Sequence, residues 1–167
     1  MASEVRIRDA SGDDAETLAE IYNHYIVTST VTFDTELKTA DERRVWLDSR
    51  EAFHPVIVAE ENGRVLGYAA LSGWAVRPAW RHTAEAGVYL RPEATGKGVG
   101  AALLGELIER ARTGDMHALI AQIVSDNSAS IAVFERAGFR RVGTLEQVGR
   151  KFDRWLDVDL LELIVEP

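Results

Sequence analysis

The densest group of chemically informative residues in this chain is a glycine-rich loop, Gly96-Lys97-Gly98-Val99-Gly100. A strand-like segment precedes the loop, and apolar residues at helical spacing follow it. Glycines let an anion approach the backbone without Cβ clashes, and successive N–H groups at a helix start can hold phosphate oxygens. The loop predicts a site for a mononucleotide, a dinucleotide or another pyrophosphate ligand. The alternative interpretation is a flexible turn.

Two well-known phosphate-binding motifs fit this loop poorly. A P-loop requires Ser or Thr directly after its lysine, and Lys97 is followed by glycine. Gly96, Gly98 and Ala101 match the dinucleotide fingerprint G-x-G-x-x-G/A, but they lie past the middle of the chain. The Arg91–Thr95 approach is longer than the tight turn of that motif, and no acidic residue ends the next apolar run. A dinucleotide oxidoreductase is therefore a remote alternative.

Composition narrows the classes of protein to which the chain can belong. Its 167 residues predict a single domain over 1–167, and 46% hydrophobic residues with 28% charged residues are typical of a soluble globular protein. The chain has no cysteine and its four histidines form no ligand motif, so we expect no metal. A net charge of −8 disfavours a nucleic-acid partner. No leader or membrane-spanning run is evident, so we expect a cytoplasmic location without a membrane partner.

Hydrophobic periodicity predicts the element order β-α-α-β-β-β-α-β-α-β-β, which is an α/β (α+β) fold with a mixed central β-sheet and helices on both faces. Strands are expected at 5–8, 55–61, 64–71, 85–91, 118–124, 139–144 and 153–165. Helices are expected at about 13–26, 40–53, 103–111 and 128–137, and residues 28–35 read as a loop or an edge. The apolar run 118–124 suits a strand buried on both faces, as in a parallel pair.

Capping and turn residues indicate where several of these elements begin or end. Asp13, with Glu16 three residues on, predicts the start of the first helix, and Thr39–Glu42 forms a full capping box for the second. Asn62-Gly63 between two apolar runs is a strong hairpin signal. Gly138 is the expected residue just beyond the last helix.

A second segment identifies the ligand of the glycine loop. Asn127–Phe139 (NSASIAVFERAGF) resembles the signature of GNAT-superfamily N-acetyltransferases, in which the loop that matches Thr95–Gly100 binds the pyrophosphate of acetyl-CoA. Three further segments, Ile21–Glu36, Thr83–Tyr89 and Gln147–Asp157, look like those of phosphinothricin acetyltransferases, a group similar to the methionine sulfoximine/sulfone acetyltransferases. The resemblance covers nearly the whole chain. It implies the GNAT fold and direct acetyl transfer from acetyl-CoA to a primary amine in a ternary complex.

The resemblance also implies an acetyl-CoA site. The backbone N–H of Val88 or a neighbour would polarise the thioester carbonyl, and Tyr89 and Leu90 would pair with the pantetheine amides. The glycine loop would hold the diphosphate, and Asn127 and Ser130 would contact the pantetheine end. The expected cofactor-binding residues are therefore Val88, Tyr89, Leu90, Gly96, Lys97, Gly98, Val99, Gly100, Ala101, Asn127 and Ser130.

By the same resemblance, Glu85 is the expected general base, and partial burial would raise its pKa toward the useful range. The alternative is a solvated carboxylate at a strand end. The acceptor amine is expected beside Trp74, Ala75, Val76, Arg77, Glu85, Ala86 and Gly87. The guanidinium of Arg77 suits a carboxylate or phosphinate, and Arg81, Arg150 and Phe152 are weaker candidates.

Two positions depart from the family pattern. Thr95 stands where the loop usually has Arg or Gln, which removes one charge-assisted phosphate contact. Phe134 stands where many relatives have Tyr or His, and a phenyl ring cannot protonate the leaving thiolate. We therefore assign no general acid: Ser130 or solvent supplies the proton, or the thiolate leaves as an anion.

Three functions stay open at this stage. The first is acetylation of a small amino-acid-like amine, and the second is acetylation of a polyamine, an aminoglycoside or a protein N-terminus. The third is CoA binding without turnover, for which Phe134 is the main support. In relatives, the segment around Phe152 comes near the neighbouring subunit's site, which implies a homodimer.

Overall fold

The computed structural model describes residues 4–166 and contains one seven-stranded β-sheet in the order β1-β2-β3-β4-β5-β7-β6. Its strands are β1 (Arg6–Asp9), β2 (Val56–Glu61), β3 (Arg64–Gly73), β4 (Thr83–Leu90), β5 (Ala118–Val124), β6 (Arg140–Lys151) and β7 (Arg154–Ile164). Its α-helices are α1 (Ala15–Thr28), α2 (Ala40–Asp48), α3 (Val99–Thr113) and α4 (Ser128–Arg136). β4 and β5 are parallel and all other neighbours antiparallel, so the predicted mixed sheet and element order are confirmed.

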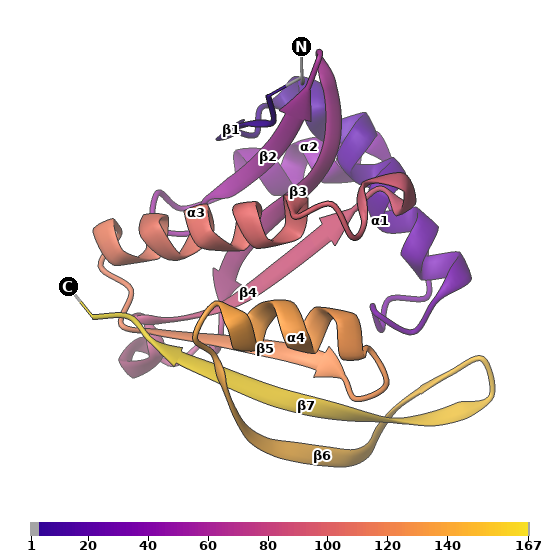
Figure 1. Ribbon diagram of the computed structural model, residues 1–167, viewed down its shortest axis with the longest axis vertical. Helices are drawn as coiled ribbons and strands as arrows, with labels where there is room; N and C mark the ends of the chain where they lie inside the picture. Colours follow the sequence, from indigo (N-terminus) through magenta and orange to yellow (C-terminus); the bar gives the residue numbers. More distant parts are fainter. Residues whose placement is uncertain (1–3, 167) are drawn as a thin grey trace.

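Helices cover both faces of the sheet, as Figure 1 shows. One core cluster joins α3 and α4 to side chains such as Ile57 and Leu71, and the other joins α1 to side chains such as Val58 and Tyr68. Successive residues of a strand point to opposite faces, so β2 and β3 carry nearly continuous apolar runs. None of the helices within residues 4–166 combines the length and apolar character that crossing a bilayer requires.

The parallel pairing of β4 with β5 is short. Thr83, Ala84 and Glu85 lie opposite residues 118–120, and within the described chain the pairing ends there. Beyond Glu85 the two strands diverge (Figure 1), while β5 continues along β7 on its other side. The rest of β4 therefore has an edge without a strand partner on the β5 side. Gln122 is exposed in this part of β5, so the predicted burial of 118–124 on both faces is only partly correct.

The second helix starts where the sequence predicts, but the first does not. The Thr39 hydroxyl accepts the Glu42 N–H at 3.1 Å, and the Glu42 carboxylate accepts the Thr39 N–H at 2.7 Å. Before α1, the Ser11 N–H instead donates to the Asp14 carboxylate at 2.8 Å, and α1 begins only at Ala15. The predicted Asp13 cap is therefore wrong.

Two long-range contacts explain where sequence patterns misplace element ends. Arg8 of β1 pairs with Asp14 at 2.8 Å and draws that carboxylate inward. α2 ends at Asp48 rather than near Phe53, because Arg50 turns to donate to the carbonyls of His54 and Leu71. The last hairpin also reaches further than predicted, since β6 extends from Arg140 to Lys151.

Candidate active site

The glycine loop leads directly into α3. Gly96 and Gly98 have φ of +72° and +82°, a left-handed conformation that glycine adopts without strain. Gly98 is the N-cap, and the first helical bond runs from the Ala102 N–H to its carbonyl at 3.0 Å. The N–H groups of the first turn are therefore free to donate, at the end of the helix that attracts anions.

A cleft of about 280 Å³ runs from this loop along the free edge of β4. It brings together seven of the predicted cofactor-binding residues, namely Val88, Tyr89, Leu90, Gly96, Gly100, Asn127 and Ser130. Gln122 and Ile123 of β5 and Phe134 of α4 line the same cleft. Lys97, Gly98 and Ala101 are exposed just outside it, and Val99 is buried in the core.

Asn127 and Phe134 already have structural roles in α4. The Asn127 side-chain oxygen accepts the Ser130 N–H at 3.2 Å, which caps the helix and leaves the amide NH₂ free. Phe134 is 3% exposed and packs edge-to-face on Phe139 at 5.0 Å between ring centroids. The ring offers no proton, so the structure provides no general acid at this position.

Glu85 lies at the point where β4 and β5 diverge. It is half-buried, opposite Ser72 on β3 and Ile120 on β5. Burial raises the pKa of its carboxyl above the ordinary value, and contact with the Gln122 side chain offsets part of that rise. A poorly solvated carboxylate therefore lies beside the part of β4 that no longer pairs with β5.

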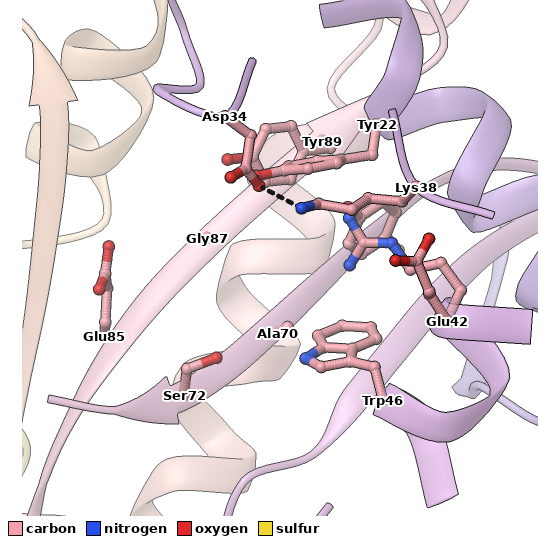
Figure 2. A pocket seen from close by; sticks show the side chains of 12 residues that line it. Tyr22, Asp34, Lys38, Glu42, Trp46, Ala70, Ser72, Glu85, Gly87 and Tyr89 are labelled. Atoms are coloured by element: carbon pink, nitrogen blue, oxygen red, sulfur yellow. Dashed lines mark hydrogen bonds and ion pairs between the residues drawn. The ribbon is translucent and has the colours of Figure 1, made fainter. Parts of the chain in front are cut away.

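A second cavity of about 500 Å³ opens from Glu85 on the α1 and α2 side of the sheet (Figure 2). Alternate residues of β4 (Glu85, Gly87 and Tyr89) line it, because successive strand residues face opposite sides. Its other lining residues are Tyr22, Asp34, Lys38, Glu42, Arg43, Trp46, Tyr68, Ala70 and Ser72. We call this space the polar cavity. Gly87 and Tyr89 line both the cleft and the polar cavity, so the two spaces adjoin at β4.

Tyrosines form the wall between the two spaces. Tyr89 stacks on Tyr68 at 5.5 Å between ring centroids and meets Tyr22 edge-on at 5.1 Å. Burial raises the pKa of the Tyr89 hydroxyl, so it stays protonated at neutral pH. Sequence reasoning missed Tyr22, Arg43 and the other α1 and α2 residues of the cavity. The available signal was the i, i+3 spacing of Arg43 and Trp46 after the Thr39 cap, which places both on one helix face.

The structure places the other predicted acceptor-binding residues differently. Ala86 lines the cleft rather than the polar cavity. The 74–77 loop after β3 is mostly exposed, Val76 fully so, and it lines neither space. Arg81 lies 3.7 Å from Asp115, Arg150 lies near the end of β6, and Phe152 lies in the β6–β7 turn. Within residues 4–166 no cluster of three or more candidate ligands could hold a metal.

Comparison with known proteins agrees with this geometry. Residues 18–139 match the acetyltransferase (GNAT) family. The chain is 39% identical over 158 residues to an L-methionine sulfoximine/L-methionine sulfone acetyltransferase of Salmonella typhimurium, covering 94% of this chain and 92% of the relative. It is 39% identical over 160 residues to a phosphinothricin N-acetyltransferase of Streptomyces coelicolor, covering 93% and 94%.

A solved structure of yncA from Salmonella typhimurium with its cofactor acetyl-CoA superposes with a TM-score of 0.94 at 37% identity, covering 97% of this chain and 94% of that one. The chain therefore belongs to the acetyltransferase (GNAT) family. The predicted family, the GNAT fold and the assignment as an acyltransferase are confirmed.

The raised pKa of Glu85 predicts that its ionisation costs stability. As pH rises, the Glu85 carboxyl ionises in the unfolded state before it ionises in the folded state. The folded state therefore loses stability between the unfolded and folded pKa values, and the loss stays constant at higher pH. The stability of Glu85→Gln relative to the wild type should therefore rise with pH between the ordinary carboxyl pKa and the raised pKa of Glu85, and stay constant above it. The free energy of unfolding in urea measures this difference.

Glu93→Gln is the matched control, for which we expect the opposite change in the free energy of unfolding. Its own backbone N–H, followed by the Arg64 and Arg91 charges, holds the pKa of Glu93 below the ordinary value. Ionised Glu93 therefore stabilises the fold above the unfolded pKa, and the control variant should lose stability at neutral pH. A Glu85→Gln difference that stays flat or falls with pH would contradict the assigned burial cost.

Proposed function

We propose that this protein is an acetyl-CoA-dependent N-acetyltransferase for the primary amine of a small amino-acid-like substrate, of the phosphinothricin or methionine sulfoximine/sulfone type, by direct transfer in a ternary complex. The observation that carries the proposal is the position of Glu85. Its half-buried carboxylate lines the polar cavity, two residues before Gly87, which lines both the polar cavity and the cleft of the glycine loop. The activities for which the two relatives are named support this substrate class.

The cleft has the features that acetyl-CoA requires. The free edge of β4 at Val88–Leu90 offers backbone groups to the pantetheine amides, as an added strand would use them. The Tyr25 hydroxyl already donates to the Leu90 carbonyl, whose second lone pair stays available. The left-handed glycines and the first turn of α3 suit the diphosphate. Acetyl-CoA supplies the acetyl group as a thioester, which is the activated acyl donor.

Glu85 removes the proton that keeps the amine from acting as a nucleophile. The amine nitrogen then forms a bond to the acetyl carbonyl carbon, and the carbon–sulfur bond breaks to give the amide and the CoA thiolate. A backbone N–H at Val88 stabilises the oxyanion, as the family resemblance implies. The raised pKa makes Glu85 a stronger proton acceptor than a solvated carboxylate. Because Phe134 cannot donate a proton, the thiolate leaves as the anion or takes its proton from Ser130 or solvent.

The charge of the polar cavity favours an amino acid over a polyamine as the acceptor. Asp34, Glu42 and Glu85 line it together with Lys38 and Arg43, but Asp34 lies 3.6 Å from the Lys38 ammonium and Glu42 caps α2. An acceptor with one amine for Glu85 and one anionic group for Arg43 therefore fits the cavity better than a polycation, whose second ammonium meets the Arg43 charge. A CoA-binding module without turnover would not need a buried carboxylate that costs stability.

Replacing Glu85 tests the proposed base. In a thiol-release assay with acetyl-CoA and L-methionine sulfone, Glu85→Gln should lower kcat/KM by about 100-fold at neutral pH, because a glutamine cannot accept the amine proton. The Kd for acetyl-CoA should stay unchanged. Glu93→Gln, which alters an exposed carboxylate paired with Arg64, should keep wild-type kcat/KM. Full activity of Glu85→Gln would remove Glu85 from the mechanism.

We also propose a homodimer formed through the β6–β7 hairpin. Both strands extend beyond the helices (Figure 1). The strands and their turn carry exposed apolar side chains, namely Val142, Leu145, Val148, Phe152 and Trp155. Such a group of exposed apolar side chains is typical of an interface. A cytoplasmic location and the absence of a nucleic-acid partner stay predictions.

Light scattering tests the dimer. The wild type should have twice the mass of the 18.5 kDa chain, and Trp155→Glu should give monomers because it places a charge on a side chain that is 60% exposed in the single chain. Trp80→Glu, which changes an exposed tryptophan in the β3–β4 connection, should stay dimeric. A monomeric wild type, or dissociation by Trp80→Glu alone, would contradict this interface.

A further inference from the structure

The polar cavity contains a buried arginine, Arg43, that forms no ion pair within residues 4–166. Arg43 of α2 is only 9% exposed, and its Nε–H has no hydrogen-bond acceptor among residues 4–166. A buried guanidinium normally pairs with a carboxylate, because removing a charge from water costs free energy that only a partner group offsets. Arg43 therefore keeps at least one donor that the protein itself does not satisfy.

The carboxylates that share the cavity are engaged with other groups. Asp34 accepts the Tyr22 hydroxyl at 2.6 Å and lies 3.6 Å from the Lys38 ammonium. Figure 2 shows this Asp34–Lys38 pair across the upper part of the cavity. Glu42 points back to cap its own helix through the Thr39 N–H. Neither carboxylate forms an ion pair with Arg43 in the part of the chain that the structure describes.

Aromatic rings hold the guanidinium in place. Its central carbon lies 4.2 Å from the Tyr22 ring centroid and 4.9 Å from that of Trp46. Rings stabilise the cation but accept none of its in-plane N–H bonds, which form a rigid fork suited to carboxylate and phosphinate oxygens. The site is thus preorganised for an oxyanion.

The position of Arg43 relative to Glu85 links this site to the acceptor. Both residues line one cavity, with Glu85 on β4 at one side and the α2 residues Glu42 and Trp46 at the other (Figure 2). An acceptor whose amine reaches Glu85 therefore extends its other groups toward α2. Ser72 and Ala70 of β3 lie between the two sides.

We propose that Arg43 determines acceptor specificity by binding an oxyanion of the acceptor, a carboxylate or a phosphinate, through its unpaired in-plane donors. This inference rests on the proposed function, because it assigns the anionic group of the same acceptor. Arg43 acts on the acceptor and takes no part in the acyl transfer itself. The exposed 74–77 loop, which the sequence favours for this role, lines neither space.

Kinetics with two acceptors measure how much Arg43 contributes to acceptor binding and identify which anionic group it binds. Phosphinothricin carries a carboxylate and a phosphinate, whereas L-methionine sulfone carries only the carboxylate. Arg43→Gln should lower kcat/KM by about 100-fold, mainly through KM, for each acceptor whose anion Arg43 binds. A loss for phosphinothricin alone assigns the phosphinate, and a comparable loss for both assigns the carboxylate. Unchanged kcat/KM for both acceptors overturns the proposal.

A binding measurement separates recognition from a structural role. The Arg43 Nε–H resonance, assigned by its loss in Arg43→Lys, should shift when phosphinothricin is added to the CoA complex, and also with L-methionine sulfone if the carboxylate is the bound group. It should not shift with the α-carboxamide of methionine sulfone if the carboxylate is bound, or with either sulfone compound if the phosphinate is bound. Equal shifts with all three compounds, or with none, overturn the proposal.

Two further variants keep the test interpretable. Arg44→Gln removes the neighbouring exposed arginine of α2, which pairs with Asp41 at 2.9 Å, and should leave both acceptors unaffected. Arg43→Lys keeps the charge without the fork and should retain the fold while losing part of the specificity, even where Arg43→Gln unfolds. A wild type that acetylates no amine while its Arg43 resonance still responds to anions would overturn the proposed function and leave the oxyanion site standing.

Discussion

β4 and β5 pair in parallel for only three residue pairs, and every part of the site depends on where that pairing stops. Glu85 is the last residue of β4 that pairs with β5, so it lies at the point where the two strands diverge. Beyond it, the free edge of β4 lines the cleft that leads to Gly96 and Gly98. A parallel pair joins segments distant in sequence, and here it brings Glu85 beside Ile120 and Gln122. This one interruption of the pairing therefore positions Glu85, the proposed base, and opens the cleft that we propose for the cofactor.

The site contains charged groups whose burial the protein compensates only in part. Glu85 has a raised pKa because it is poorly solvated, and the buried guanidinium of Arg43 faces aromatic rings rather than a carboxylate. The buried carboxylate of Asp14, by contrast, is paired with Arg8. Unpaired or strongly perturbed groups that collect in one cavity are typical of functional sites, because a ligand completes their interactions. The two halves of the site meet at Tyr89, whose ring separates the cofactor cleft from the polar cavity.

Local sequence signals predicted the features that depend on neighbouring residues. The glycine loop, the Asn62-Gly63 hairpin and the Thr39 cap all follow from backbone chemistry within a few positions. The start of α1 was misplaced because the buried Arg8–Asp14 pair, a tertiary contact, decides it. The α1 and α2 residues of the polar cavity could not be predicted, since only packing of those helices on β3 and β4 brings them to Glu85. Family resemblance supplied the role of Glu85, and the structure adds its burial and its neighbours.

The central claim is that the buried carboxylate and the adjoining cavity serve acetyl transfer to an amino-acid-like amine. The most direct measurement is thiol release from acetyl-CoA by the wild-type protein across a panel of acceptors: common amino acids, phosphinothricin, methionine sulfoximine and polyamines. The account predicts the highest kcat/KM for phosphinothricin or methionine sulfoximine and little turnover of polyamines. Preference for polyamines, or tight CoA binding without turnover of any amine, would contradict it.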